Sequence, residues 1–248
     1  MAIELPKSKI PASVSDPRNL IIFSKPKYGK SSACAALPDA LCIDFENGGY
    51  DYIDAVKIKA NTVAELKEIC KAIIDAGKPY KFIVLDTITR LEEIAKPLAL
   101  KIFQDTPAGS KFTGKDVLTA PNGAGYNALR TAIEMCIDMV SKCAPNLILV
   151  CHTKDAAVGA GDINVRQIDL LGKTGRILAS KSDAIGYLDR DEDSNTILSF
   201  NTNDKFVECG ARPEHLRNKD VVLGEMQSDG TVEYHWERIY TSLANNND

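Results

Sequence analysis

The sequence predicts an α/β fold with a mainly parallel central sheet and an antiparallel extension at its carboxyl end. Four short apolar runs lack polar alternation, so we expect strands that are buried on both faces of a sheet. These runs are residues 20–23, 40–45, 82–86 and 147–151. Segments with helical periodicity lie between them, which is typical of crossover units on a parallel sheet. After residue 183, short strand candidates separated by turns such as Asp229–Gly230 indicate the antiparallel extension.

Four helices are expected between these strands. They cover a segment that ends at residue 37, then residues 63–76, 88–103 and 124–143. Pro38 ends the first helix, because proline lacks the N–H that a helix interior needs. Thr62 and Glu65 have the spacing of a capping box at the start of the second helix. Pro97 predicts a kink in the third helix, and the fourth carries an apolar stripe at helical spacing.

The remainder of the chain contains five short strand candidates. They are residues 184–189, 196–201, 205–209, 221–223 and 231–236. Neither an internal repeat nor a break in composition marks a second domain, so residues 18–240 are expected to form one domain. Residues 1–17 are expected to be a loose segment, and residues 241–248 a disordered tail.

The composition is that of an ordinary globular protein: 248 residues, 44% hydrophobic and 26% charged, with a net charge of −4. An acidic net charge argues against a protein that coats nucleic acid, so any such contact needs a local basic strip or loop. The seven cysteines are scattered and odd in number, which favours reduced thiols and a cytoplasmic location. No apolar stretch is long enough for a signal peptide or a membrane span, so we expect no membrane partner.

Residues 24–31, SKPKYGKS, follow the first strand and precede the first helix, which is the context of a phosphate-binding P-loop. The P-loop pattern is GxxxxGK followed by Ser or Thr, and Ser24 stands here in place of its first glycine. Backbone N–H groups at a helix start bind phosphate, while Lys30 would reach the β- and γ-phosphates and Ser31 would hold Mg²⁺. The sequence therefore predicts ATP and Mg²⁺ as cofactors; the alternative is a chance match in a strand-to-helix turn. The expected nucleotide contacts are Ser24, Lys25, Pro26, Lys27, Tyr28, Gly29, Lys30, Ser31 and Ser32.

Polar side chains follow the other expected parallel strands. Asp86 ends one of them and is placed to hold Mg²⁺ through water; the alternative, a helix N-cap, is compatible with that role. Hydrolysis needs a group that orients or deprotonates water, and Glu46 is the first candidate with Asp44 the second; the alternative is a polar turn that ends a strand. His152 would face the γ-phosphate and sense hydrolysis; the alternative is a structural histidine.

Taken in order, these motifs resemble the core of the RecA-like P-loop ATPases. They are most similar to the small phage-encoded RecA-like proteins of single-strand annealing and recombination. The resemblance covers roughly residues 18–212 and is carried by IIFSKPKYGKSS, CIDFENGG, FIVLDTITRLEE, LILVCHTK and LLGKTGRILASKSDAIGYLDRD. It implies a catalytic glutamate at Glu46 and a polar sensor at His152. Ser24 departs from the family pattern, and the loops differ in length and composition.

Proteins of this kind assemble into rings or filaments with ATP between subunits, so the resemblance implies a homo-oligomer. A basic residue of the neighbouring subunit reaches the γ-phosphate in such assemblies. The resemblance implies Arg212 for this role, with Lys205 second; the alternative for Arg212 is an ordinary solvated side chain.

The resemblance also implies that two loops at the carboxyl edge of the sheet face the axis of the assembly and bind single-stranded DNA. They are residues 105–122 and 155–171. The first loop carries one aromatic residue between two lysines, a minimal pattern of stacking and charge. The candidate nucleic-acid contacts are Lys111, Phe112 and Lys115 in the first loop, Arg166 in the second, and Lys154 at its entrance. The alternative is that both are ordinary solvated loops.

The sequence as a whole predicts a RecA-like ATPase that binds and hydrolyses ATP and acts on single-stranded DNA in phage recombination or replication. If it is phage-encoded, the expected location is the cytoplasm of the host cell. Two alternatives stay open: a nucleotide-gated assembly protein with little or no turnover, and a small-molecule kinase. The lack of an arginine-rich lid segment argues against the kinase.

Overall fold

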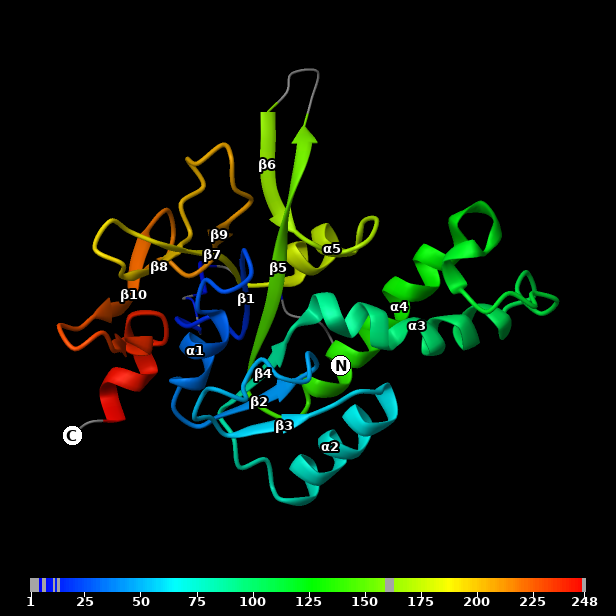
Figure 1. Cartoon of the computed structure of the whole chain (residues 1–248), viewed down its shortest axis with the longest axis horizontal. Coiled ribbons are helices and arrows are strands. Elements are labelled where there is room, and N and C mark those ends of the chain that lie inside the picture. The colour runs from blue at the N-terminus through cyan, green and yellow to red at the C-terminus, as the bar shows by residue number, and fades with distance from the viewer. Residues whose placement is uncertain (1–4, 6–7, 11, 13, 159–162, 247–248) are drawn as a thin grey trace.

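The chain, seen in a computed structural model, is described at residues 5, 8–10, 12, 14–158 and 163–246. The parts of the expected amino-terminal segment, second loop and tail at residues 1–4, 6–7, 11, 13, 159–162 and 247–248 lie outside the described residues. Within the described residues, one sheet of 11 strands has helices on both faces (Figure 1). None of the described helices is long and apolar enough to cross a membrane.

The centre of the sheet is parallel, in the order β7–β1–β5–β4–β2–β3. Its strands are β1 (Asn19–Ser24), β2 (Ala40–Asp44), β3 (Lys57–Lys59), β4 (Phe82–Asp86), β5 (Asn146–Val158) and β7 (Ala184–Arg190). The four predicted buried strands are thus confirmed. The edge strand β3 was not predicted, because its three residues are all exposed and give no apolar signal. Since parallel strands end at one edge, the polar residues that follow them meet there.

The carboxyl-terminal strands extend the sheet in antiparallel fashion from β7, as predicted. They are β8 (Thr196–Ser199), β10 (Asp220–Met226) and β11 (Val232–Tyr234), while β9 (Gly210–Ala211) also pairs with β7. The strand expected at 205–209 is wrong: this segment contacts Arg166 instead, whose N–H donates to the oxygen of Phe206 over 2.7 Å. The strand expected at 231–236 ends early, because buried Trp236 turns into a short 3₁₀ helix.

Five helices cover the described part of the sheet: α1 (Lys30–Ala35), α2 (Val63–Asp75), α3 (Ile88–Gln104), α4 (Ala124–Val140) and α5 (Thr174–Lys181). Alternate residues of each central strand point to opposite faces and fill two cores. Ile21 and Phe23 pack with α2, α3 and α4 on one face, whereas Leu20 and Ile22 pack with α1 and the carboxyl-terminal segment on the other. The P-loop helix is therefore held between the sheet and the end of the chain.

Two segments predicted as loops at the carboxyl edge differ from expectation. Strand β5 continues past the edge and pairs with β6 (Ile163–Ile168) as an antiparallel ribbon, so backbone pairing replaces the second loop. The first loop, residues 105–122, lies at the end of the α3–α4 hairpin that is farthest from the sheet (Figure 1). It is partly ordered by packing, since Val117 and Ala120 are buried in the core. This loop is therefore not at the edge where the parallel strands end.

Candidate nucleotide-binding site

The loop between β1 and α1 has the geometry of an anion cradle. Gly29 has a φ of 97°, a left-handed conformation that favours glycine. It directly precedes Lys30, the first residue of α1, so the N–H groups that start the helix face the loop. A helix start of this kind attracts phosphate.

Lys30 is a buried cation whose hydrogen-bond partners are all neutral. Its side chain is almost fully covered, and its Nζ donates to the main-chain oxygens of Ser24 (3.2 Å) and Lys25 (3.0 Å). It also donates to Ser24 Oγ over 3.1 Å, so the serine that replaces the first P-loop glycine supplies an acceptor. Burial lowers the pKa of Lys30, while Asp86 and Glu46 raise it again. An ammonium held by neutral acceptors is well suited to an arriving anion.

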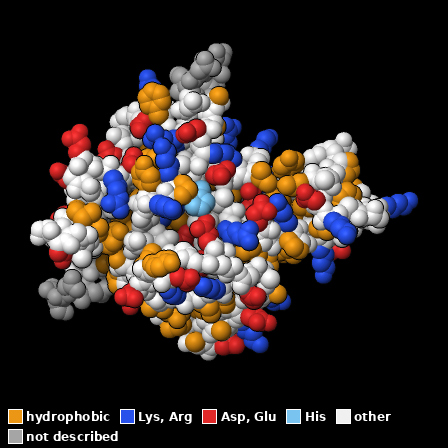
Figure 2. Space-filling model, in the orientation of Figure 1, with side chains coloured by type: hydrophobic (Ala, Val, Ile, Leu, Met, Phe, Trp, Pro, Cys, Tyr) orange, Lys and Arg blue, Asp and Glu red, His pale blue; other side chains and the backbone are white. Residues whose placement is uncertain are grey.

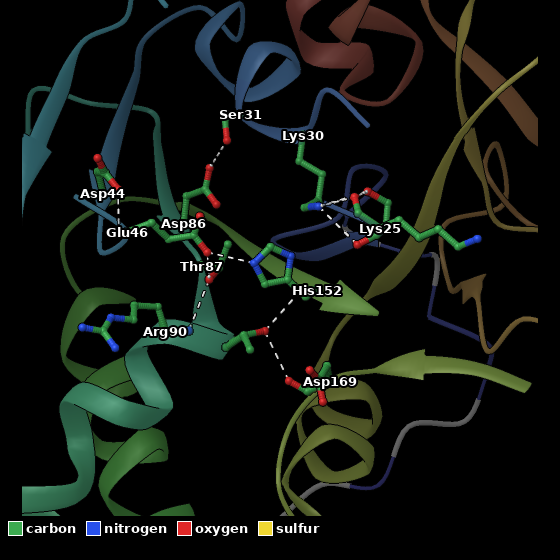
Figure 3. A network of polar contacts seen from close by, with 12 residues as sticks. Lys25, Lys30, Ser31, Asp44, Glu46, Asp86, Thr87, Arg90, His152 and Asp169 are labelled. Carbon is green, nitrogen blue, oxygen red and sulfur yellow. Dashed lines mark hydrogen bonds and ion pairs between the residues drawn. The ribbon is translucent and has the colours of Figure 1, made fainter. Parts of the chain in front are cut away.

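Ser31 and Asp86 form a direct pair between the start of α1 and the end of β4. The Ser31 hydroxyl donates to Asp86 Oδ2 over 2.7 Å (Figure 3). Asp86 is 3% exposed, and burial raises the pKa of its carboxyl, against the hydrogen bond from Ser31. A hydroxyl and a carboxylate side by side are the hard oxygen donors that Mg²⁺ prefers, so this pair fits a magnesium ion.

The side chain of Glu46 is 37% exposed and is oriented by two side chains, one just after β4 and one on β5. Its Oε1 lies 2.8 Å from His152 Nε2 and accepts a hydrogen bond from the Thr87 hydroxyl over 2.9 Å (Figure 3). The hydrogen bond from His152 is the main cause that lowers the pKa of Glu46, with Thr87 adding to it against the effect of burial. Glu46 is therefore an oriented carboxylate near neutral pH.

Asp44, the second candidate for orienting the attacking water, instead accepts hydrogen bonds from the main chain of the turn that follows it. It is 1% exposed, and its Oδ1 accepts from the N–H of Glu46 over 2.8 Å while its Oδ2 accepts from Gly48 over 3.4 Å. Asp44 thus shapes the turn that presents Glu46. Thr87 was not predicted as a site residue, although its position directly after Asp86 was the available signal.

A cavity of about 470 Å³ joins these groups. It is lined by Pro26, Lys27, Gly29, Lys30, Ser31, Ser32, Glu46, Gly49, Ile53, Asp86, Thr87 and His152. Of the predicted nucleotide contacts, Ser24 and Lys25 reach the cavity through their bonds to Lys30, and Tyr28 packs instead against the core that covers α1. Figure 2 shows the molecule in the orientation of Figure 1, and a histidine lies near the centre of this view among acidic and basic side chains.

The family described as an AAA domain matches residues 16–213 of the chain, which include every element that builds this cavity. The chain belongs to the AAA domain family. It is a P-loop ATP-binding protein with a RecA-like α/β fold, and nucleotide binding in this family typically involves Mg²⁺. Among solved structures, it is similar to a KaiC-like protein from the hyperthermophilic archaeon Pyrococcus horikoshii OT3, with 11% identity and a TM-score of 0.46. That similarity covers 87% of this chain and 89% of the other. No curated protein matches the chain.

Arg212 is not part of this cavity. Its Nη2 donates to the oxygen of Ser180 over 2.8 Å, and its Nη1 lies 3.6 Å from Asp183. Asp183 precedes β7 and bonds to the N–H of Asn19 at the start of β1, so Arg212 lies at the amino edge of the sheet, opposite the P-loop. Lys205 lies elsewhere, in an exposed turn beside the β5–β6 ribbon.

The candidate nucleic-acid contacts are spread over two places. Lys111 and Lys115 are exposed at the far end of the α3–α4 hairpin, and the ring of Phe112 packs edge-on against Phe103 at 5.3 Å. Lys154 and Arg166 lie on the ribbon. Lys154 bonds to the oxygen of Leu170 and lies 3.6 Å from Asp169, while Arg166 lies 3.9 Å from Asp155 and covers the ring of Tyr187. The far end of the α3–α4 hairpin, which carries Lys111 and Lys115, is therefore distant from the cavity at Lys30 (Figure 1).

Proposed function

We propose that this chain hydrolyses ATP and that Glu46 orients the attacking water. The observation that carries the proposal is the joint placement of four side chains at one cavity. Glu46, aligned by His152, faces the cavity that Lys30 and the Ser31–Asp86 pair also line. Phosphoryl transfer depends mainly on positioning and charge, so a cation, a metal-binding pair and an oriented carboxylate at one cavity are the parts it requires.

Each residue has a distinct part in this proposal. Lys30 and the N–H groups of the loop bind the phosphate chain, and Ser31 and Asp86 hold Mg²⁺, which supplies positive charge to the phosphates when bound. Glu46 is ionised at neutral pH because its pKa is lowered, so it can accept a hydrogen bond from water. His152 senses the γ-phosphate through its contact with Glu46.

The test compares ATP binding and turnover in two variants with matched controls on the exposed face of α2. Lys30→Ala is expected to lose nucleotide binding, whereas Lys67→Ala is expected to bind normally. Glu46→Gln is expected to bind Mg·ATP but to lose hydrolysis by about 100-fold or more, whereas Glu68→Gln is expected to hydrolyse normally. If the wild type binds Mg·ATP without turnover, hydrolysis is wrong, and nucleotide-dependent oligomerisation would support a nucleotide-gated assembly protein instead.

We further propose that the ATPase acts on single-stranded DNA, in phage recombination or replication as the resemblance of its motifs implies. A groove at the base of the ribbon supports the DNA-binding part. The residues that line this cavity of about 490 Å³ include Lys154 of β5, Lys173 and Arg176 near the start of α5, and one carboxylate, Glu208. Lys173 and Arg176 are exposed, and no carboxylate of the described residues lies within ion-pair distance of either.

An aromatic ring lies beside Gly172, one of the residues that line this groove. Tyr126 of α4 is 47% exposed, and its ring lies 3.6 Å from the position that a Cβ atom would take at Gly172, beside Lys173. Aromatic rings with adjacent cations are the usual means of holding single strands, because bases stack and phosphates pair with the charges. Lys154, which lines this groove, belongs to β5, the strand that also carries His152.

We propose that ATP lies between subunits of a ring or filament, with a basic residue of the neighbour at the γ-phosphate. Arg212 would have to leave Asp183 and Ser180 to reach it. Lys205 needs no such release, since none of the described carboxylates forms an ion pair with it.

A further inference from the structure

The main chain of His152 is held on both sides by groups far away in sequence. Its N–H donates to the hydroxyl of Thr89 over 3.1 Å, and its oxygen accepts from the N–H of Asp169 over 2.9 Å. The Thr89 hydroxyl in turn donates to the oxygen of Asp169 over 3.2 Å, so the three residues form a closed ring of hydrogen bonds. These contacts fix the point from which the imidazole of His152 projects toward Glu46.

Glu92 holds the connection between β6 and α5, the segment that contains Asp169. It lies one turn after Thr89 on the same face of α3, is 5% exposed, and both its carboxylate oxygens accept from the N–H of Leu171, at 3.0 and 3.1 Å. Leu171 belongs to the short connection between β6 and α5 that also contains Asp169. The first turns of α3 therefore hold this connection at two points, and through Asp169 they hold His152.

We propose that Thr89 and Glu92 are positioning residues for His152, which set the direction of its imidazole toward Glu46. This inference rests on the proposed hydrolysis of ATP, in which Glu46 orients water. Catalytic geometry is sensitive to displacements of about 1 Å, which can change a rate by about 100-fold. Because α3 begins directly after Asp86 and Thr87, the helix that holds the main chain of His152 also starts beside the carboxylate proposed to bind the metal.

The experiment compares Glu92→Leu with Glu92→Gln and with Glu93→Leu. Glutamine keeps an oxygen that can accept from Leu171, and Glu93 is the exposed neighbour that pairs with Lys96 instead. Glu92→Leu is expected to lower kcat by about 10- to 100-fold with the KM for ATP within about twofold. Glu92→Gln is expected to recover most of kcat, and Glu93→Leu to match the wild type. Thr89→Val, which removes the hydroxyl at nearly constant volume, is expected to resemble Glu92→Leu.

A second readout does not depend on turnover. The chain has three histidines, so the imidazole resonances of His152 can be assigned by comparison with a His152 variant. In Glu92→Leu and Thr89→Val the Nε2 resonance of His152 is expected to move, because its contact with Glu46 changes, while His215 and His235 stay in place. Thermal melting of each variant separates this effect from a loss of folding.

The outcomes separate the two proposals. If the wild type does not hydrolyse ATP, or Glu46→Gln turns over as fast as the wild type, the proposed function is wrong. The His152 resonance alone then decides whether Thr89 and Glu92 position the imidazole. If Glu92→Leu and Thr89→Val melt lower but keep the wild-type kcat and His152 resonance, their role is only structural and the inference is overturned. If Glu92→Gln is as impaired as Glu92→Leu, hydrogen bonding to Leu171 is not the cause, and the inference is overturned as well.

Discussion

The indole nitrogen of Trp236 donates a hydrogen bond to the main-chain oxygen of Ala33 over 2.8 Å. Ala33 belongs to α1, the helix of six residues that starts at the P-loop, and Trp236 is 2% exposed just after the last strand. A helix this short has little stability of its own. The carboxyl-terminal segment therefore holds the helix that carries Lys30 and Ser31.

Trp236→Phe is expected to lower the free energy of unfolding by about 1–3 kcal/mol, because the Ala33 oxygen loses its buried donor. It is also expected to weaken Mg·ATP binding by letting α1 move. Urea unfolding followed by circular dichroism and a nucleotide titration measure the two effects, with Tyr80→Phe as the control, because Tyr80 packs against the core on the other face of the sheet. A variant that is less stable but binds ATP with wild-type affinity would show that Trp236 does not support the P-loop.

The pH dependence of hydrolysis is expected to report the partners of Glu46. Its lowered pKa means that the carboxylate form persists to a lower pH than in an ordinary glutamate. In His152→Ala the main cause of the lowering is gone, so the pKa rises and activity is lost at a higher pH on the acid side. Thr87→Val should move the acid limb in the same direction by less. Profiles of kcat against pH measure this, and His215→Ala is the control; an acid limb that stays in place in His152→Ala would contradict it.

Single-stranded DNA is expected to bind at the groove of Lys173 and Arg176, beside Tyr126, and not at Phe112. Tyr126→Ala should weaken DNA binding by about 1–3 kcal/mol, and the pair Lys173→Ala and Arg176→Ala should also make binding less dependent on salt. Phe112→Ala should instead lower stability, because its ring packs on Phe103. Fluorescence anisotropy with labelled oligonucleotides and thermal melting separate these effects. The DNA proposal fails if the double variant binds and is stimulated like the wild type.

Mixing subunits tests the proposal that a neighbouring subunit supplies a basic residue at the γ-phosphate. In the proposed assembly, a Glu46→Gln subunit has an inactive site but can still donate a basic residue, so adding it to Lys205→Ala protein is expected to restore turnover. Arg212→Ala should retain activity, because its guanidinium is held by Asp183 within its own chain. Rates as a function of the mixing ratio measure this. Rescue of Arg212→Ala and not of Lys205→Ala would reverse the assignment.

Much of the site could be predicted because its residues follow strands with strong apolar patterns. Glu46, Asp86 and His152 each come at or just after the end of a buried parallel strand, so the rule that such strands share one edge brings them together. The hydrogen bonds from Thr87 and from the Thr89–Glu92 face of α3 could not be predicted in this way. They depend on side-chain directions across segments that are distant in the chain.

The remaining differences have local causes. The ribbon of β5 and β6 follows a central strand, and its polar and small residues were interpreted as a loop because pairing between two such segments leaves a weak apolar signal. The sequence patterns that predict roles for Arg212 and Phe112 carry no information on the residues around them. The structure shows Arg212 bonded to Asp183, and Phe112 packed on Phe103.

Because strand β5 is continuous, a tilt of the strand at His152 would displace its far end at Val158. His152 pairs with Ser24 at the edge of the central sheet, and the same strand runs six residues further to Val158, a length of about 20 Å. If a change at the γ-phosphate tilted the strand at His152 by about 5°, the main chain at Val158 would move by about 1.7 Å over that length. A small rotation beside Glu46 would then produce a larger displacement at the far end of the ribbon. A bound strand or a neighbouring subunit in contact with that end would be displaced with it.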